Sequence, residues 1–133
     1  CLVTQEKNQK FSETDSTAIL ENSSLAFSLE NMVKCLPGPM PMWTRKMMEH
    51  VGFLDEANHD YADDWELWLR SVNAGFKFKK VDQVLGLYRS GGRSQSENNI
   101  EQSKEEASLF YKYSHLFGKN YNKFEPYFRQ FIK

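Results

Sequence analysis

Apolar residues recur at helical spacing near the middle of the chain. The clearest stripe repeats at i, i+3, i+4 and i+7 and consists of Trp65, Trp68, Leu69 and Val72. Such spacing places apolar side chains on one face of a helix. We expect this helix to begin at Asp63, with Asp63 and Glu66 as a capping box, and to end at Gly75.

The C-terminal part of the chain predicts two more helices. The first runs from Ser96 to about Phe117 and stops at Gly118. Its apolar face is formed by Ile100, Ala107, Phe110 and Tyr111. The second has an apolar face formed by Phe124, Tyr127, Phe128, Phe131 and Ile132. This second pattern is close to an ideal amphipathic helix.

Two shorter helices are expected before Asp63. Apolar residues at helical spacing predict one over residues 25–36, which the Pro37-Gly38-Pro39 sequence ends. Thr44 is placed to cap a second helix through His50, and Gly52 to close it.

Three segments predict strands. Residues 1–4 are apolar, residues 76–81 alternate apolar side chains with lysines, and residues 84–88 follow after one turn. Residues 5–24 are mostly polar, so we expect a surface loop there. The mixture of helices and short strands predicts an α/β fold.

Composition indicates a folded chain without a dominant surface charge. The 133 residues are 40% hydrophobic and 14% aromatic, with 17 basic and 18 acidic residues and a net charge of −1. This balance gives no support for nucleic-acid binding. Cys1 and Cys35 match no zinc or redox motif, and no apolar run approaches the roughly 20 residues of a membrane span. We expect a cytoplasmic location, with attachment to a membrane surface as an alternative.

The acidic cluster around Asp64 is the first candidate for chemistry. Asp63 and Asp64 lie where an irregular loop meets a predicted helix N-terminus. The helix dipole and free backbone N–H groups there favour an ionised carboxylate, which suits a general base. Helix capping is the more common role for aspartates at such positions, and the spacing alone favours it. The two roles are compatible, with Asp63 capping and Asp64 facing a cleft.

Metal binding and phosphate binding have weaker signals. The spacing of the acidic cluster with His59 or His50 fits neither an EF-hand nor a zinc motif, so we assign no metal site. Arg89 and Arg93 flank Gly91-Gly92 and could meet phosphate oxygens, although a plain surface turn explains this short loop as well. Trp43 lies outside the apolar stripe and is the better aromatic candidate for a cleft wall.

Several segments, in this order, resemble the acceptor half of family 2 glycosyltransferases. They are residues 39–46 with the sequence PMPMWTRK, residues 51–56 with VGFLDE, and residues 62–70 with ADDWELWLR. The later Gly75-Phe76-Lys77-Phe78 and Leu87-Tyr88-Arg89 segments are similar to this family too. The resemblance covers roughly residues 38–96.

The resemblance implies a GT-A fold and a role for five residues. Asp64 takes the position of the general base, and Asp63 the acidic position before it. Trp43 and Arg45 would line the floor near acceptor and donor. Arg89 lies where a mobile loop can close over the donor pyrophosphate. The implied partners are a nucleotide-sugar donor and a saccharide or lipid-linked acceptor.

One departure from the family is large. The Asp-x-Asp motif that holds metal and nucleotide does not occur, and neither does the nucleotide-binding half that carries it. We therefore expect residues 1–95 to be a partial catalytic domain and residues 96–133 a helical extension, inactive without the donor half. Mg²⁺ or Mn²⁺ would be held mostly by residues outside this chain. Dimer formation through the surface left exposed is a further expectation.

Two other functions remain open. A non-catalytic α/β binding or interaction module would use the acidic cluster only for helix caps. A glycoside hydrolase would need two carboxyl groups on either side of one bond, and no second partner for Asp64 stands out. A cleft that contains Asp64, with Trp43 and Arg89 on its rim, would favour the transferase. An Asp64 that points to bulk solvent would favour the interaction module.

Overall fold

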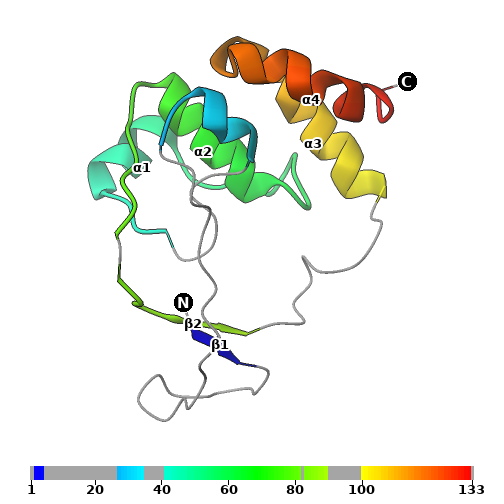
Figure 1. Cartoon of the computed structure of the whole chain (residues 1–133). Coiled ribbons are helices and arrows are strands. Elements are labelled where there is room, and N and C mark those ends of the chain that lie inside the picture. Colours follow the sequence, from blue (N-terminus) through cyan, green and yellow to red (C-terminus); the bar gives the residue numbers. More distant parts are fainter. Residues whose placement is uncertain (1, 5–26, 35–40, 82, 90–99, 133) are drawn as a thin grey trace.

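The computed structural model describes residues 2–4, 27–34, 41–81, 83–89 and 100–132 of the chain (Figure 1). In order, its elements are β1 (Leu2–Thr4), η2 (Glu30–Lys34), α1 (Arg45–Val51), α2 (Asp63–Asn73), β2 (Leu87–Arg89), α3 (Ile100–Lys112), η4 (Ser114–Leu116) and α4 (Lys119–Arg129). The predicted mixture of helices and strands is present in this part of the chain, but helices dominate it and the strands form a single short pair. None of its helices is both long and apolar enough to cross a bilayer.

Helix α2 lies at the centre of the helical body, between α1 and α3 (Figure 1). The predicted apolar stripe is confirmed, because its four side chains are all buried. Gly75 follows the helix with a φ of +89°, as expected of a residue that ends a helix. The predicted capping box is wrong. Ala62 is the cap and has no side-chain acceptor, while Glu66 is buried with other partners.

Helix α1 follows the local signals closely. The Thr44 hydroxyl accepts a hydrogen bond from the Met47 N–H at 3.2 Å, which caps the helix. Gly52 closes it with a φ of +85°. Met47 and Met48 are buried on the side of α1 that packs against α2. The predicted helix is confirmed, one residue longer than expected.

The C-terminal helices α3 and α4 pack against each other around Phe110. The Phe110 ring lies 4.4 Å from that of Phe128, 5.1 Å from Tyr121 and 5.3 Å from Phe117, centroid to centroid. The helix predicted up to Phe117 ends earlier, since α3 stops at Lys112 and the short η4 follows. Ile100, expected on the apolar face, is instead 61% exposed.

The same core continues from the C-terminal helices into α2 and η2. Trp65 of α2 stacks on Phe128 of α4 at 6.2 Å, and its indole N–H donates to the Met32 carbonyl at 2.8 Å. The Asn120 amide on α4 donates to the Glu30 carbonyl at 2.9 Å. The helix predicted over residues 25–36 is a 3₁₀ turn over Glu30–Lys34, preceded by non-helical backbone at 27–29.

The strands β1 and β2 pair in parallel, with Leu2 opposite Leu87 and Thr4 opposite Arg89. They lie apart from the helices in Figure 1. Within the described ranges neither strand has a second neighbour. The strand predicted over residues 76–81 is wrong, because Phe78 packs its ring against Trp68 and Phe27 and the backbone there pairs with no strand. The predicted strand at 84–88 is reduced to β2. The predicted loops at 5–24 and 90–94 fall outside the described residues.

Candidate functional site

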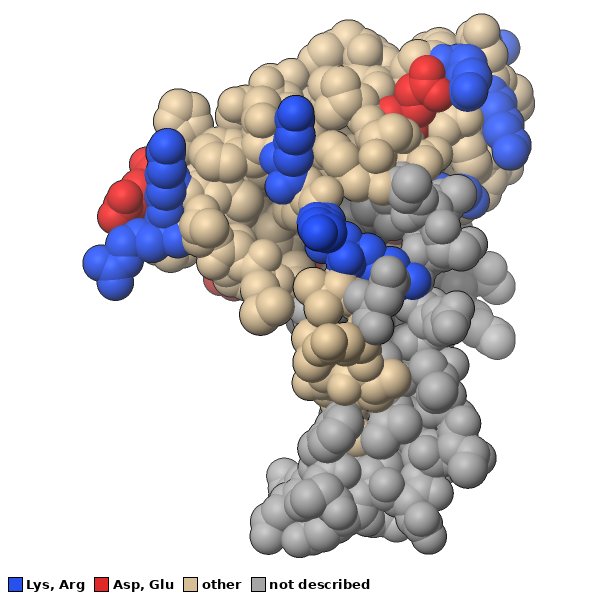
Figure 2. All heavy atoms as spheres, turned by 60° about the vertical axis from the view of Figure 1, so that its left-hand side comes forward, with Lys and Arg blue, Asp and Glu red and all other residues tan. Residues whose placement is uncertain are grey.

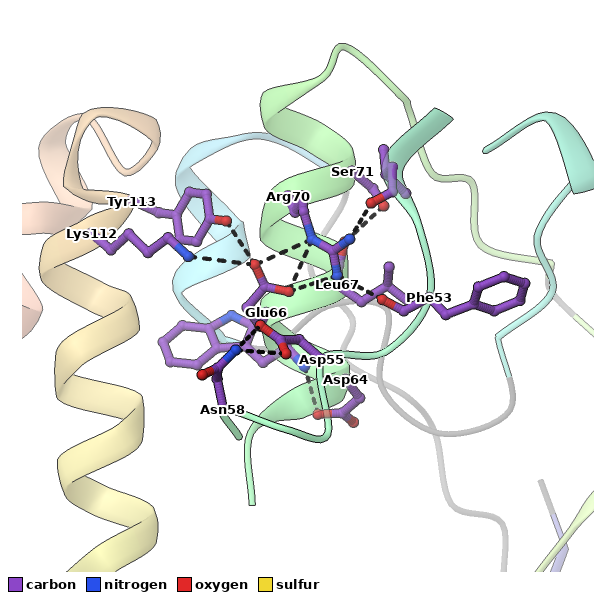
Figure 3. Close-up of polar contacts among 12 residues, drawn as sticks. Phe53, Asp55, Asn58, Asp64, Glu66, Leu67, Arg70, Ser71, Lys112 and Tyr113 are labelled. Carbon is purple, nitrogen blue, oxygen red and sulfur yellow. Dashed lines mark hydrogen bonds and ion pairs between the residues drawn. The ribbon is translucent and has the colours of Figure 1, made fainter. Parts of the chain in front are cut away.

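Asp64 lies in the first turn of α2, exposed at the surface. Its Oδ1 accepts the backbone N–H of the next residue, Trp65, at 2.6 Å. Figure 3 places this carboxylate at the start of the helix, apart from the ion pairs that Glu66 makes further along. The carboxylate is therefore accessible and held by a backbone N–H group of the helix N-terminus.

The pKa of Asp64 is raised above its usual value near 3.8. Partial withdrawal of water from the carboxyl is the main cause, and the charge of Asp63 adds to it. The Trp65 N–H opposes this shift without cancelling it. The predicted effect of the backbone N–H groups at the helix N-terminus is present, but desolvation and the neighbouring carboxylate outweigh it, so the net shift of the pKa is upward.

Trp43 packs against α2 at Trp68, one helical turn beyond Asp64. Residues four apart share one side of a helix, so Asp64 and Trp68 are neighbours along α2. The Trp43 ring packs against the Trp68 ring at 5.5 Å, centroid to centroid. Trp43 is 48% exposed, so part of its ring faces solvent. A partly exposed aromatic ring thus packs on the α2 residue that follows Asp64 by one helical turn.

An open hollow of about 430 Å³ lies beside α1. Its walls are formed by Trp43, Arg45, Met48, Glu49 and Phe53. The structure therefore brings together two of the predicted site residues, Trp43 and Arg45. Asp64 is not among the lining residues, so the predicted cleft with Asp64 inside it is not formed by this hollow.

Arg45 and Glu49 give this hollow its polar groups. They stand four residues apart on α1, so both project from one side of the helix. Glu49 was missed by sequence reasoning, although its spacing from Arg45 is a signal that could have found it. Met48 supplies an apolar floor, and the Phe53 ring is 77% exposed.

The remaining predicted residues lie elsewhere. Asp63 begins α2, where its side chain is half-buried beside Asp64. Arg89 ends β2, and its backbone pairs with Thr4. The glycine loop after Arg89 lies outside the described residues. On the face in Figure 2, basic side chains stand in separate groups, and acidic side chains accompany the groups at both ends.

A buried carboxylate, Glu66, lies two residues beyond Asp64 in the same first turn of α2 (Figure 3). It is 2% exposed and pairs with Arg70 at 2.8 Å and with the Tyr113 hydroxyl at 2.9 Å, while the Lys112 ammonium lies 3.6 Å away. Burial opposes its ionisation, but the hydrogen bonds of Arg70 and Tyr113 and the charges of Arg70 and Lys112 together hold the pKa of Glu66 below its usual range. Glu66 in turn raises the pKa of Tyr113, as burial does.

Arg70 also connects Glu66 to the end of α1 and to the loop that precedes α2. Its guanidinium donates to the Val51 carbonyl and, at 2.8 Å, to the Phe53 carbonyl. The end of α1 and the Phe53 wall of the hollow are thereby fixed to α2. The Glu66 and Arg70 spacing of four residues predicts an ion pair, but nothing local predicts Tyr113 as its third member.

Glu105 of α3 is a second residue that sequence reasoning missed. Its carboxylate accepts three successive backbone N–H groups, those of Asp60, Tyr61 and Ala62, at 2.7, 2.9 and 3.0 Å. These amides lie directly before Asp63 and Asp64. A sequence separation of more than 40 residues leaves no local pattern from which to expect this contact.

Neither a search for metal-binding clusters nor comparison with known proteins adds residues to this site. No three His, Cys, Asp or Glu side chains gather closely enough to hold a metal ion in the part of the chain that the structure describes. Comparison with known proteins finds no match among family models, curated proteins or solved structures.

Proposed function

We propose that this chain is the acceptor-side part of a family 2 glycosyltransferase, with Asp64 as the general base. The observation that carries the proposal is the Asp64 carboxylate, held by the Trp65 N–H in the first turn of α2, one helical turn before Trp68, on which Trp43 packs. The order of the sequence motifs around these residues supports the same function. The GT-A fold is part of the proposal.

The proposed reaction is a single displacement with inversion at the anomeric carbon. Asp64 takes the proton of an acceptor hydroxyl while that oxygen forms its bond to the anomeric carbon. The bond from this carbon to the nucleoside diphosphate breaks, and the leaving group departs with the electron pair. Because the pKa of Asp64 is raised, its ionised carboxylate is a stronger base than an ordinary aspartate.

The hollow beside α1 is the proposed binding site for part of the acceptor saccharide. Exposed faces of Trp43 and Phe53 suit the C–H side of a pyranose ring, whereas Arg45 and Glu49 suit its hydroxyl groups. Asp64 does not line this hollow, so in this proposal the acceptor extends from the hollow across Trp43 toward Asp64. In this proposal, the Glu66–Arg70 pair fixes the position of the Phe53 wall of the hollow relative to α2, which carries Asp64.

The strand pair supports a larger sheet in the complete enzyme. Parallel strands are normally buried in sheets with several members, and two strands of three residues each do not form a stable unit. We propose that β1 and β2 continue the sheet of a donor-binding half outside this chain. Arg89, at the end of β2, would meet the donor pyrophosphate. Mg²⁺ or Mn²⁺, bound mostly by that half, would offset the charge of the diphosphate.

Replacement of the base tests the proposal. We expect Asp64→Asn, in the complete protein, to keep its affinity for the nucleotide-sugar and to lose about 10²- to 10⁴-fold in turnover, the usual contribution of a general base. Release of nucleoside diphosphate from a panel of nucleotide-sugars with Mg²⁺ or Mn²⁺ and a panel of saccharides measures this. Glu101→Gln, which changes an exposed ion pair on α3, is the matched control. Full turnover by Asp64→Asn would contradict the assignment.

A non-catalytic interaction module is the second candidate function. The observation that favours it is the position of Asp64 outside the hollow. In that case Trp43 and Phe53 would bind a partner while Asp64 has no role. Phe53→Ala distinguishes the two, since it would weaken partner binding in the module and raise the acceptor KM in the transferase.

A further inference from the structure

We propose that Glu105 is a positioning residue for Asp64, and that helix α3 is thereby a working part of the acceptor site. The inference rests on the proposed function, because Asp64 is its target. The residues after 96 carry no family motif, so the sequence alone marks α3 only as an extension. The geometry instead places one of its carboxylates on the backbone that leads into Asp64.

The contact is a carboxylate clamp on consecutive amides. One oxygen, Oε1, accepts the Asp60 N–H at 2.7 Å, and Oε2 accepts the N–H groups of Tyr61 and Ala62 at 2.9 and 3.0 Å. Both oxygens of the group are therefore engaged. Hydrogen bonds to an ionised acceptor are roughly twice as strong as neutral ones, so the clamp is a firm attachment.

The helix start explains why such a clamp is needed. The first N–H groups of a helix and its cap lack partners in the helix itself. Ala62, at the cap position of α2, has no side-chain oxygen that could bind them. Glu105 accepts the N–H of Ala62, the cap residue itself, and places a negative charge beside the positive end of the helix dipole.

The clamp determines where Asp64 lies because the chain between them is short and regular. Ala62 is 3% exposed, and its carbonyl accepts the Glu66 N–H at 2.9 Å, the first hydrogen bond of the helix. Asp64 is two residues further along, and its own carboxylate is bound to the Trp65 N–H. A shift of the Ala62 backbone therefore moves the first turn and the carboxylate with it.

The effect on the reaction follows from the distance that proton transfer tolerates. A general base must come within hydrogen-bond reach of the proton that it takes. A misplacement of about 1 Å can lower the rate about 10²-fold. Loss of the clamp should thus lower kcat more than it changes the donor KM, because Glu105 touches no substrate.

Glu105→Gln in the complete protein tests this positioning role. The amide keeps one oxygen, but its NH₂ group faces at least one backbone N–H and cannot accept it. We expect faster hydrogen exchange at the amides of residues 60–62, a kcat about 10- to 100-fold lower and an unchanged donor KM. Glu106→Gln, whose carboxylate accepts from the Gln102 side chain on the same helix, should change none of these.

The outcomes separate this proposal from the proposed function. A ¹³C titration of the Asp64 carboxyl reports its surroundings without turnover, and we expect its midpoint to move in Glu105→Gln but not in Glu106→Gln. An unchanged midpoint and an unchanged kcat, with faster exchange at residues 60–62, would overturn the positioning role. If Asp64→Asn keeps full turnover, the proposed function fails first, and the titration still decides whether Glu105 controls Asp64.

Discussion

At the scale of single residues, two carboxylates in one helix differ in their surroundings and in their pKa. Asp64 is exposed and has no cationic partner among the residues that the structure describes, and its pKa is raised. Glu66 is buried with Arg70, Tyr113 and Lys112, and its pKa is lowered. Opposite shifts within one helical turn indicate different roles. Glu66 stabilises the fold as an anion at neutral pH, and Asp64 is left able to exchange a proton.

The lowered pKa of Glu66 predicts a stability that depends on pH. A carboxyl with a lower pKa in the folded chain stabilises it above the unfolded value, near 4.5, and this contribution disappears as the pH falls through the folded value. We expect Glu66→Gln to lower the free energy of unfolding by about 2 kcal/mol at pH 7, less than for a fully buried pair because the Arg70 side chain is 28% exposed. The difference should shrink below pH 4.5.

Urea unfolding at several pH values measures this difference. Glu101→Gln is the control, since its pair with Lys104 is exposed on both sides and contributes little. A gap between parent and Glu66→Gln that stays constant from pH 7 to pH 3, or widens, would show that the charge of Glu66 is not what stabilises the fold.

At the scale of elements, local signals predicted the position of α1 from its caps and that of α2 from its apolar stripe. Thr44 and Gly52 define α1, and the apolar stripe with Gly75 defines α2. Distant contacts decided the rest. Residues 76–81 alternate like a strand, yet Phe78 packs on Trp68, and Ala62 is capped by Glu105 from α3. Within the candidate site, Trp43 and Arg45 were predicted, whereas Glu105 had no local signal.

The two helix-ending glycines allow a matched comparison. Gly52 has φ +85° and ψ −175°, a conformation that is almost exclusive to glycine, and an added Cβ would lie 3.2 Å from Arg70 Nη1. Gly75 has φ +89° with open space around it. We expect Gly52→Ala to destabilise the fold by about 2 to 3 kcal/mol, from backbone strain and displacement of Arg70. Gly75→Ala should cost only about 1 kcal/mol.

Thermal unfolding of both variants checks this order. Gly52→Ala should also raise the acceptor KM, because Arg70 holds the Phe53 carbonyl at the wall of the hollow. Equal destabilisation by the two substitutions would mean that Arg70 does not link α1 to α2 as described.

At the scale of the whole molecule, one apolar core joins the part that resembles a transferase to the C-terminal helices. Phe110, Phe117 and Leu109 are almost fully buried, and Phe128 contacts both Phe110 and Trp65. Tyr113 and Glu105 add polar contacts across the same boundary. The two parts predicted from the sequence, residues 1–95 and residues 96–133, therefore share one continuous core.

Removal of residues 96–133 should consequently abolish cooperative folding of residues 1–95. The truncated chain would expose the α2 side chains that now contact Phe128 and would leave Glu66 without Tyr113. We expect one cooperative urea transition for the full chain, followed by tryptophan fluorescence, and a gradual change for residues 1–95. A sharp transition of the fragment alone would show that α3 and α4 are a separate unit.

The central claim is that the Asp64 carboxylate takes the proton of the acceptor hydroxyl. The most direct measurement is the rate of sugar transfer against pH, for the complete parent protein and for Asp64→Asn. We predict that the parent rate falls as the pH drops through the pKa of Asp64, above the usual 3.8, because only the ionised carboxylate is a base. Asp64→Asn should be slow at every pH and should not show this fall in rate at low pH. A variant that keeps both the parent rate and the fall at low pH would contradict the account.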